Sequence, residues 1–141
     1  MTEPGPVSDS SQLSKRAARR LIQRAFVLAG RDRNLRQHIR EVRLATVWIL
    51  EDWGLVWSVH LDRGELDFER RRAKQPDASF TWRTAEQFFE QIEKNSFDPE
   101  GFEYSGPPEL RRTFEPLYRA LSAALSEVLR NPVDENGDPL V

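Results

Sequence analysis

The sequence predicts an α+β domain, and three observations lead to that class. Apolar residues recur at helical spacing near both ends of the chain, at residues 18–29 and 110–129. Between these ends the period changes from 3.6 to 2, and two strand-like runs follow at residues 44–50 and 55–61. Another alternating run at residues 78–82 precedes a further helical stretch. Helices and strands are thus mixed along a chain of 141 residues, the size of one ordinary domain.

Composition limits the classes of function. The chain has no cysteine, which excludes a disulfide framework, a thiol nucleophile and a thiolate metal site. Residues 1–12 lack the order of basic and apolar residues that marks a secretory signal, and no run approaches the ~20 apolar residues of a membrane span. We therefore expect a cytoplasmic protein.

Charge is distributed unevenly, because residues 1–43 carry 10 Lys/Arg against 4 Asp/Glu. Such a segment could meet nucleic acid or an anionic lipid surface. It could equally be the solvated side of a helix docked on an acidic body, and we take this as the default.

Both ends of the chain are predicted to be tails. Residues 1–11 are rich in Pro, Gly and Ser, and residues 131–141 carry Pro, Gly and acidic residues. The domain is therefore expected to span residues 12–130.

The first predicted helix covers residues 12–29. An apolar stripe with spacings of three and four supports it, and Gly30 is a natural stop. The side opposite the stripe is basic and carries Lys15, Arg16, Arg19, Arg20 and Arg24. A shorter helix is expected at residues 33–42.

Three strands should follow. Residues 44–50 are apolar on both faces, which fits the middle of a sheet. Residues 55–61 alternate, and residues 62–64 should form a three-residue hairpin turn with Gly64 in the left-handed region. The charged run at residues 65–71 suits an edge strand. A loop at residues 72–77 then leads to the fourth strand, residues 78–82.

Thr84 and Gln87 match a capping box, in which the threonine oxygen accepts a free amide of the first helical turn. A helix is therefore expected at residues 85–94. Phe102 and Tyr104 indicate a short last strand that ends at residues 106–108, a Gly-Pro-Pro break.

The closing helix has the most regular apolar stripe of the chain, from Leu110 to Leu129. Pro116 interrupts this stripe. Because proline removes an amide donor and crowds the preceding turn, we expect a kink, or two helices that meet near Glu115.

The sequence shows no arrangement of residues that is typical of a catalytic site. His38 and His60 lie in different elements, and Glu65, Asp67 and Glu69 share one face of an edge strand, where solvation explains them. The chain has neither a G-x-S-x-G motif nor a glycine-rich phosphate loop. We therefore predict no catalytic residue, no metal site, no cofactor and no nucleic-acid binding.

Three segments resemble the sterol carrier protein type-2 family: PDASFTWRTAEQFFEQI (76–92), VWILEDWGLVWSVHL (47–61) and FEYSG (102–106) before a leucine-rich helix. The resemblance covers roughly three-quarters of the chain. It implies a five-stranded mixed β-sheet with helices packed mainly on one face, and it places residues 44–50 in the middle of that sheet.

Members of that family bind sterols, fatty acids, acyl-CoA or phospholipids in a cavity between sheet and helices. The resemblance therefore implies a non-catalytic lipid or acyl-chain carrier whose ligand-binding residues are Trp57, Val59, Phe68, Phe80, Phe88, Ile92, Phe114, Leu117, Leu121 and Leu125. One departure is the stretch at residues 93–102, which lacks the family's Gly-Lys pair and short apolar turn.

A second function remains open at this point. An aromatic or leucine stripe at helical spacing is more often plain core than a ligand wall. The chain could therefore be an accessory interaction or dimerisation module of the same fold with a filled cavity. Its partners would then be another protein or a second copy of the chain, and the basic helix at residues 12–29 could instead meet an anionic membrane surface.

Overall fold

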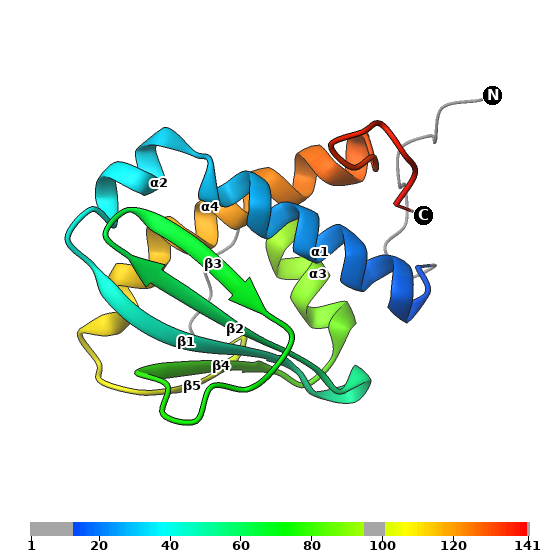
Figure 1. Ribbon diagram of the computed structural model, residues 1–141. Coiled ribbons are helices and arrows are strands. Elements are labelled where there is room, and N and C mark those ends of the chain that lie inside the picture. Colours follow the sequence, from blue (N-terminus) through cyan, green and yellow to red (C-terminus); the bar gives the residue numbers. More distant parts are fainter. Residues whose placement is uncertain (1–12, 95–100, 141) are drawn as a thin grey trace.

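A five-stranded mixed sheet, ordered β3-β2-β1-β4-β5, forms one layer of the part of the chain that the computed structural model describes, residues 13–94 and 101–140 (Figure 1). The strands are β1 (Arg43–Leu50), β2 (Leu55–Asp62), β3 (Glu65–Glu69), β4 (Ala78–Trp82) and β5 (Glu103–Ser105). Strand β1 is central, antiparallel to β2 and parallel to β4. The predicted α+β class, the central strand and the charged edge strand β3 are confirmed.

The second layer consists of helices on one face of the sheet (Figure 1). The helices are α1 (Lys15–Gly30), α2 (Arg33–His38), α3 (Ala85–Glu93) and α4 (Leu110–Arg130), and a short 3-10 helix, η2 (Glu51–Trp53), lies in the turn between β1 and β2. Helix α1 packs on α4 and β3, and α3 packs on α4 and β4. Within the described residues, no helix is both long and apolar enough to cross a bilayer.

The pairing register of the strands explains which side chains meet the helices. Trp48 on β1 lies opposite Trp57 on β2 and Phe80 on β4, so a row of aromatic residues crosses three strands on the helix-facing side. Val47 points to the other face and is nevertheless fully buried. The chain between β3 and β4 turns back over that face, where the carbonyl of Arg71 accepts a hydrogen bond from the Ser58 hydroxyl.

The turn between β2 and β3 differs from the prediction. Asp62 pairs with Glu65, so the turn has two residues and not three. Both Arg63 (φ +51°) and Gly64 (φ +91°) are left-handed, as hairpins of this length require. The Gly64 amide donates to the Ile39 carbonyl, and a Cβ on Gly64 would lie 3.3 Å from the carbonyl oxygen of Arg36.

Side chains cap three helices at their first turns. Ser14, Asp32 and Thr84 accept from the amides of Ala17, Leu35 and Gln87, respectively. Helix α2 ends at His38, four residues before the predicted end, with the Ile39 amide bonded back into its last turn.

Helix α4 is continuous through Pro116. The alternative of two helices meeting near Glu115 is therefore wrong. Proline occupies the second turn of the helix, where the long run of residues after it still supplies a regular hydrogen-bonded ladder.

The predicted C-terminal tail is also a structured part of the protein. Residues 131–140 fold back beside α1 and the end of α4, with an isolated bridge between Val133 and Pro139 and with Leu140 only 6% exposed. Composition misled the prediction, because two buried residues, Pro132 and Leu140, are enough to anchor a segment that is otherwise polar. The predicted N-terminal tail, residues 1–11, lies outside the described residues.

Candidate apolar ligand site

The ten residues that the family resemblance implies come from five elements. The sheet contributes Trp57, Val59, Phe68 and Phe80, helix α3 contributes Phe88 and Ile92, and helix α4 contributes Phe114, Leu117, Leu121 and Leu125. All ten belong to, or pack against, one apolar cluster between sheet and helices. Nine are buried, and Phe68 near the sheet edge is half-buried. The sequence therefore identified a set that the fold brings together.

Aromatic contacts dominate the centre of this layer. The Phe80 ring lies 4.7 Å from that of Phe114 in an edge-to-face contact and 5.2 Å from Trp48, centroid to centroid. Trp82 lies 5.0 Å from Phe88, also edge to face. Contacts of this geometry stabilise a core beyond the area they bury, by about 0.5–1.5 kcal/mol for each pair.

The layer is tightly packed where the aromatic rows meet the helices. The gap there is lined by Ile22, Phe26, Trp48, Ile49, Leu50, Trp57, Trp82 and Phe88, and it leaves no volume that a water-sized sphere can occupy. No preformed hollow exists at that point. A guest molecule would have to displace side chains there.

Three aromatic residues that line this gap, Phe26, Trp48 and Trp82, are missing from the sequence-based set. Phe26 lies within 6.0 Å of Trp57 and 5.8 Å of Trp48, ring to ring. Its spacing of four from Ile22 could have placed it on the stripe of the first helix. Trp48 and Trp82 could have been found from strand alternation, because each shares a face with residues already chosen.

Buried polar groups in and around the layer have partners. The Thr46 hydroxyl donates to the Val59 carbonyl at 2.8 Å and accepts from the Trp48 indole at 3.0 Å. The Ser122 hydroxyl of α4 donates to the Ile92 carbonyl at the end of α3. Among the described residues, the exception is Nε of Arg19, which is buried without a hydrogen-bond partner.

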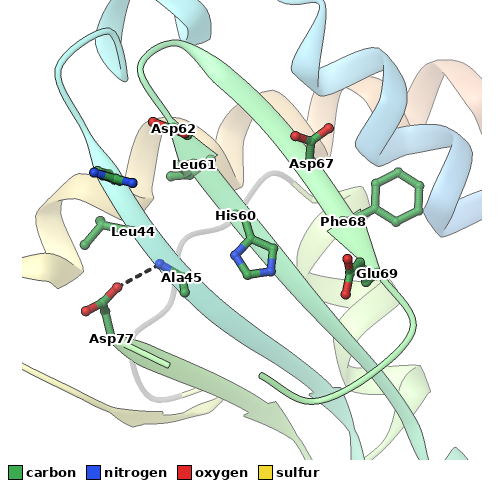
Figure 2. Close-up of a pocket in the computed structure, with 10 residues that line it drawn as sticks. Leu44, Ala45, His60, Leu61, Asp62, Asp67, Phe68, Glu69 and Asp77 are labelled. Atoms are coloured by element: carbon green, nitrogen blue, oxygen red, sulfur yellow. Dashed lines mark hydrogen bonds between the residues drawn. The ribbon is translucent and has the colours of Figure 1, made fainter. Parts of the chain in front are cut away.

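A second candidate site is a hollow of about 780 Å³ on the face of the sheet away from the helices (Figure 2). Its lining residues are Arg43, Leu44, Ala45, His60, Leu61, Asp62, Asp67, Phe68, Glu69 and Asp77. His60 lies in register between Ala45 and Asp67. Phe68 points away from the hollow, toward α1 (Figure 2).

The chemistry of this hollow is polar. Four carboxylates and one arginine line it, and Glu69 is paired with Arg71 at 2.6 Å. In the part of the chain that is described, no group of three His, Cys, Asp or Glu side chains could hold a metal ion. The hollow therefore differs in kind from the apolar site that the sequence predicted.

Asp77 ties the start of β4 to β1 at the rim of this hollow. Its carboxylate accepts from the Ala45 amide at 2.7 Å, and its own amide donates to the Ala45 carbonyl at 2.7 Å. Asp77→Ala is expected to lower the free energy of unfolding by about 1 kcal/mol, because one charged hydrogen bond is lost at an exposed position. Urea unfolding would measure this. Asp67→Ala, an exposed carboxylate on the same face, is the control and should change stability by less than about 0.5 kcal/mol; equal losses would contradict the role of Asp77.

Comparisons with solved structures identify the fold. The chain aligns over 89% of its length with 95% of a conserved hypothetical protein from Thermus thermophilus, whose description names a sterol carrier protein as a candidate identity (TM-score 0.53, 13% identity). It also aligns over 75% of its length with 94% of the UbiJ-SCP2 ubiquinone synthesis protein (TM-score 0.51, 11% identity). No protein-family profile and no curated protein sequence matches this chain.

A third similarity is partial. The inverting sec-alkylsulfatase Pisa1 from Pseudomonas sp. aligns with 58% of this chain at a TM-score of 0.49 and 16% identity. The chain spans only 14% of the length of that enzyme. The two longer alignments establish a sterol-carrier-protein-like fold for this chain.

Proposed function

We propose that this chain is a non-catalytic binding protein that takes a lipid or acyl chain between its sheet and its helices. The observation that carries the proposal is the apolar layer itself: the ten residues implied by the family resemblance lie together in a fold shared with candidate sterol carriers. The site carries the proposal, because a shared fold alone hosts many activities.

Ligand entry requires the layer to open. Helix α4 offers a place for this, because Pro116 lacks an amide hydrogen and weakens the ladder between the first turn and the rest of the helix. Phe114 belongs to that first part and contacts Phe80 at 4.7 Å. Displacing Phe114 would expose the aromatic centre of the layer.

The free energy gained by burying an acyl chain, set against the cost of association, permits weak and reversible binding. Burying a chain of ~16 carbons at ~0.8 kcal/mol per methylene gives about 13 kcal/mol. Association costs about 4–15 kcal/mol, and displacement of packed side chains adds to that cost. The affinity should therefore be micromolar or weaker, which suits a carrier that must release its ligand.

Arg19 is the polar group suited to orient such a ligand. It lies three residues before Ile22, so it flanks the apolar stripe of α1 and does not stand opposite it as the sequence predicted, and its buried Nε is unpartnered. An anionic end such as a carboxylate would satisfy this group while the tail enters the layer. The ligand class that fits is an anionic amphiphile, for example a fatty acid.

The packed gap beside Trp48 favours a second candidate function. If the layer stays closed, the same fold serves as an accessory module that binds another protein or a second copy. The two functions differ in whether a lipid ever enters the layer.

One experiment separates them. Protein purified from its host would be denatured in organic solvent, the extract examined by mass spectrometry, and the tryptophan emission of the apoprotein followed during titration with fatty acids. The carrier function predicts a stoichiometric lipid or a saturable change in emission. Absence of both would favour the closed module.

A further inference from the structure

Residues 131–140 form a compact loop of their own. The carboxylate of Asp134 accepts from the amides of Asn136 at 2.8 Å and Asp138 at 2.9 Å. Gly137 adopts a left-handed conformation with φ +82°, and the Leu140 amide closes the loop by donating to the Pro132 carbonyl. Hydrogen bonds within the loop therefore define its shape, apart from its contacts with the rest of the protein.

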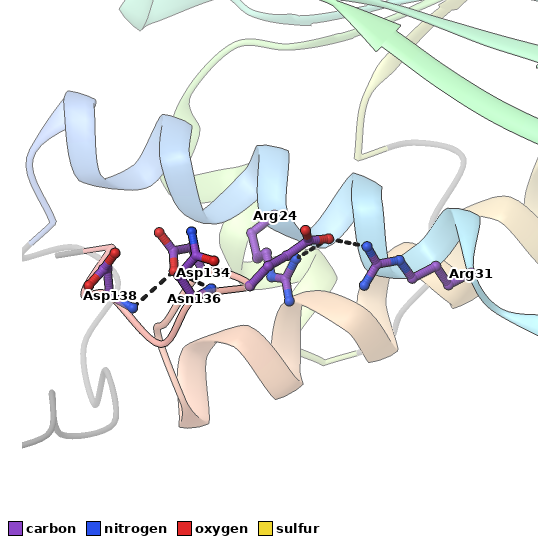
Figure 3. A network of polar contacts seen from close by, with 6 residues as sticks. Arg24, Arg31, Asp134, Asn136 and Asp138 are labelled. Atoms are coloured by element: carbon purple, nitrogen blue, oxygen red, sulfur yellow. Dashed lines mark hydrogen bonds and ion pairs between the residues drawn. The ribbon is translucent and has the colours of Figure 1, made fainter.

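The loop lies along α1, beside Arg24 and Arg31 (Figure 3). The Glu135 carboxylate pairs with Arg31 and lies 3.5 Å from the guanidinium of Arg24. Arg20 donates to the Pro139 carbonyl at 3.3 Å. The hydrogen bond and charge of Arg31, supported by Arg24, hold the pKa of Glu135 below its ordinary value.

Arg20 and Arg24 in α1 and Arg31, which directly follows its last residue, are spaced by four and seven residues, so they fall on one side of the helix axis. This is the basic side that the sequence left to solvent, a membrane or a partner. From Ala17 to Gly30 each residue of α1 is buried or half-buried. The C-terminal loop thus occupies a surface that would otherwise be exposed and cationic.

The loop is held weakly by charge and more strongly by Leu140. The side chains of Arg31 and Glu135 are 58% and 56% exposed, and pairs of that kind contribute little and are screened by salt. Leu140 is only 6% exposed and belongs to the main apolar cluster. Two buried residues, Pro132 and Leu140, and a few exposed contacts are few enough for a competing segment to replace.

We propose that the arginine side of α1, defined by Arg20, Arg24 and Arg31, is a docking surface for an acidic peptide segment of a partner protein. In the free protein, residues 131–140 occupy that surface. The loop shows which chemistry fits: a carboxylate between two guanidiniums, a backbone carbonyl on the third, and one aliphatic side chain in the core. The proposal does not depend on lipid binding.

A peptide is favoured over a lipid surface because the observed contacts are those of a peptide. A planar membrane offers charge, but it offers neither a backbone carbonyl to Arg20 nor a single leucine to the cluster. The tethered loop also has an effective concentration of about millimolar, so it competes strongly with a partner in solution.

The test uses the full chain with Glu135→Lys and Leu140→Asp, which should release the loop. A fluorescent peptide with the sequence of residues 132–141 is added, and its anisotropy is measured. We expect the released variant to bind the peptide at least tenfold more tightly than the unaltered protein does. A peptide carrying the same two substitutions should not bind.

The matched control for charge is Ala123→Asp with Glu127→Lys, both exposed on α4. It should bind no more peptide than the unaltered protein. If the released variant does not fold, as judged by a cooperative thermal transition, a chain ending at Asn131 replaces it and the same expectation applies. If the variant folds but does not bind the peptide, the proposal is overturned. It is also overturned if the variant binds phosphatidylglycerol vesicles or RNA more tightly than it binds the peptide.

Discussion

Trp82→Ala is expected to lower the free energy of unfolding by about 3–5 kcal/mol, the usual loss for a buried aromatic residue. Trp82 is 1% exposed and contacts Trp48 at 5.5 Å and Phe88 at 5.0 Å, ring to ring. Its indole also donates to Gln91 at 3.2 Å, and that bond is lost with the ring. Urea unfolding followed by far-ultraviolet circular dichroism would measure the effect.

Trp53→Ala is the matched control for this change. Trp53 lies in the turn between β1 and β2 and is only half-buried. Its replacement should cost about half as much or less, because less apolar area returns to water. Similar losses for the two tryptophans would mean that Trp82 is not at the centre of the core.

Leu121→Ala is expected to lower the free energy of unfolding by about 2–5 kcal/mol. Leu121 is fully buried on α4 within the layer between sheet and helices. The substitution leaves a hollow beside packed side chains, and a hollow with apolar walls readily accepts an apolar guest. If an acyl chain enters this layer, the variant should bind a fatty acid more tightly than the unaltered protein, measured by titration of tryptophan emission.

Two further variants at α4 sharpen this prediction. Leu121→Trp fills the layer and should reduce uptake of the fatty acid while the protein still unfolds cooperatively. Leu110→Ala removes a half-buried leucine from the same helix and should leave uptake unchanged. If neither Leu121→Ala nor Leu121→Trp changes the affinity for the fatty acid, the ligand does not bind in this layer.

Local pattern was enough to predict most of the fold. The two-faced apolar run at residues 44–50 identified the central strand, because only a strand covered on both sides is apolar on both faces. The threonine before α3 identified its start, since an N-cap is a local interaction between residues three apart. Features set by neighbours in sequence were therefore accessible.

Features that depend on residues far apart in the sequence could not be predicted from local pattern. The turn at Arg63 and Gly64 is held by carbonyls of Val42 and Ile39, more than twenty residues earlier in the chain. The C-terminal loop is anchored by Leu140 and by arginines over a hundred residues away. Neither contact leaves a periodic signal.

The family resemblance implied ten residues that the fold does bring together, but it did not give the volume between them. Whether large side chains leave a hollow depends on rotamers and on how closely the layers approach, and the gap beside Trp48 is closed. The aromatic residues that close it, Phe26 and Trp82, were outside the predicted set.

The position of a bound acyl chain tests the central claim most directly. A fatty acid with a diazirine near the end of its tail would be bound, photolysed and located by peptide mass spectrometry. Lipid binding within the layer predicts labels on Phe88 or Ile92 of α3 and on Leu117 or Leu121 of α4. Labels confined to the polar hollow around His60, or no label that an unlabelled fatty acid can displace, would contradict it.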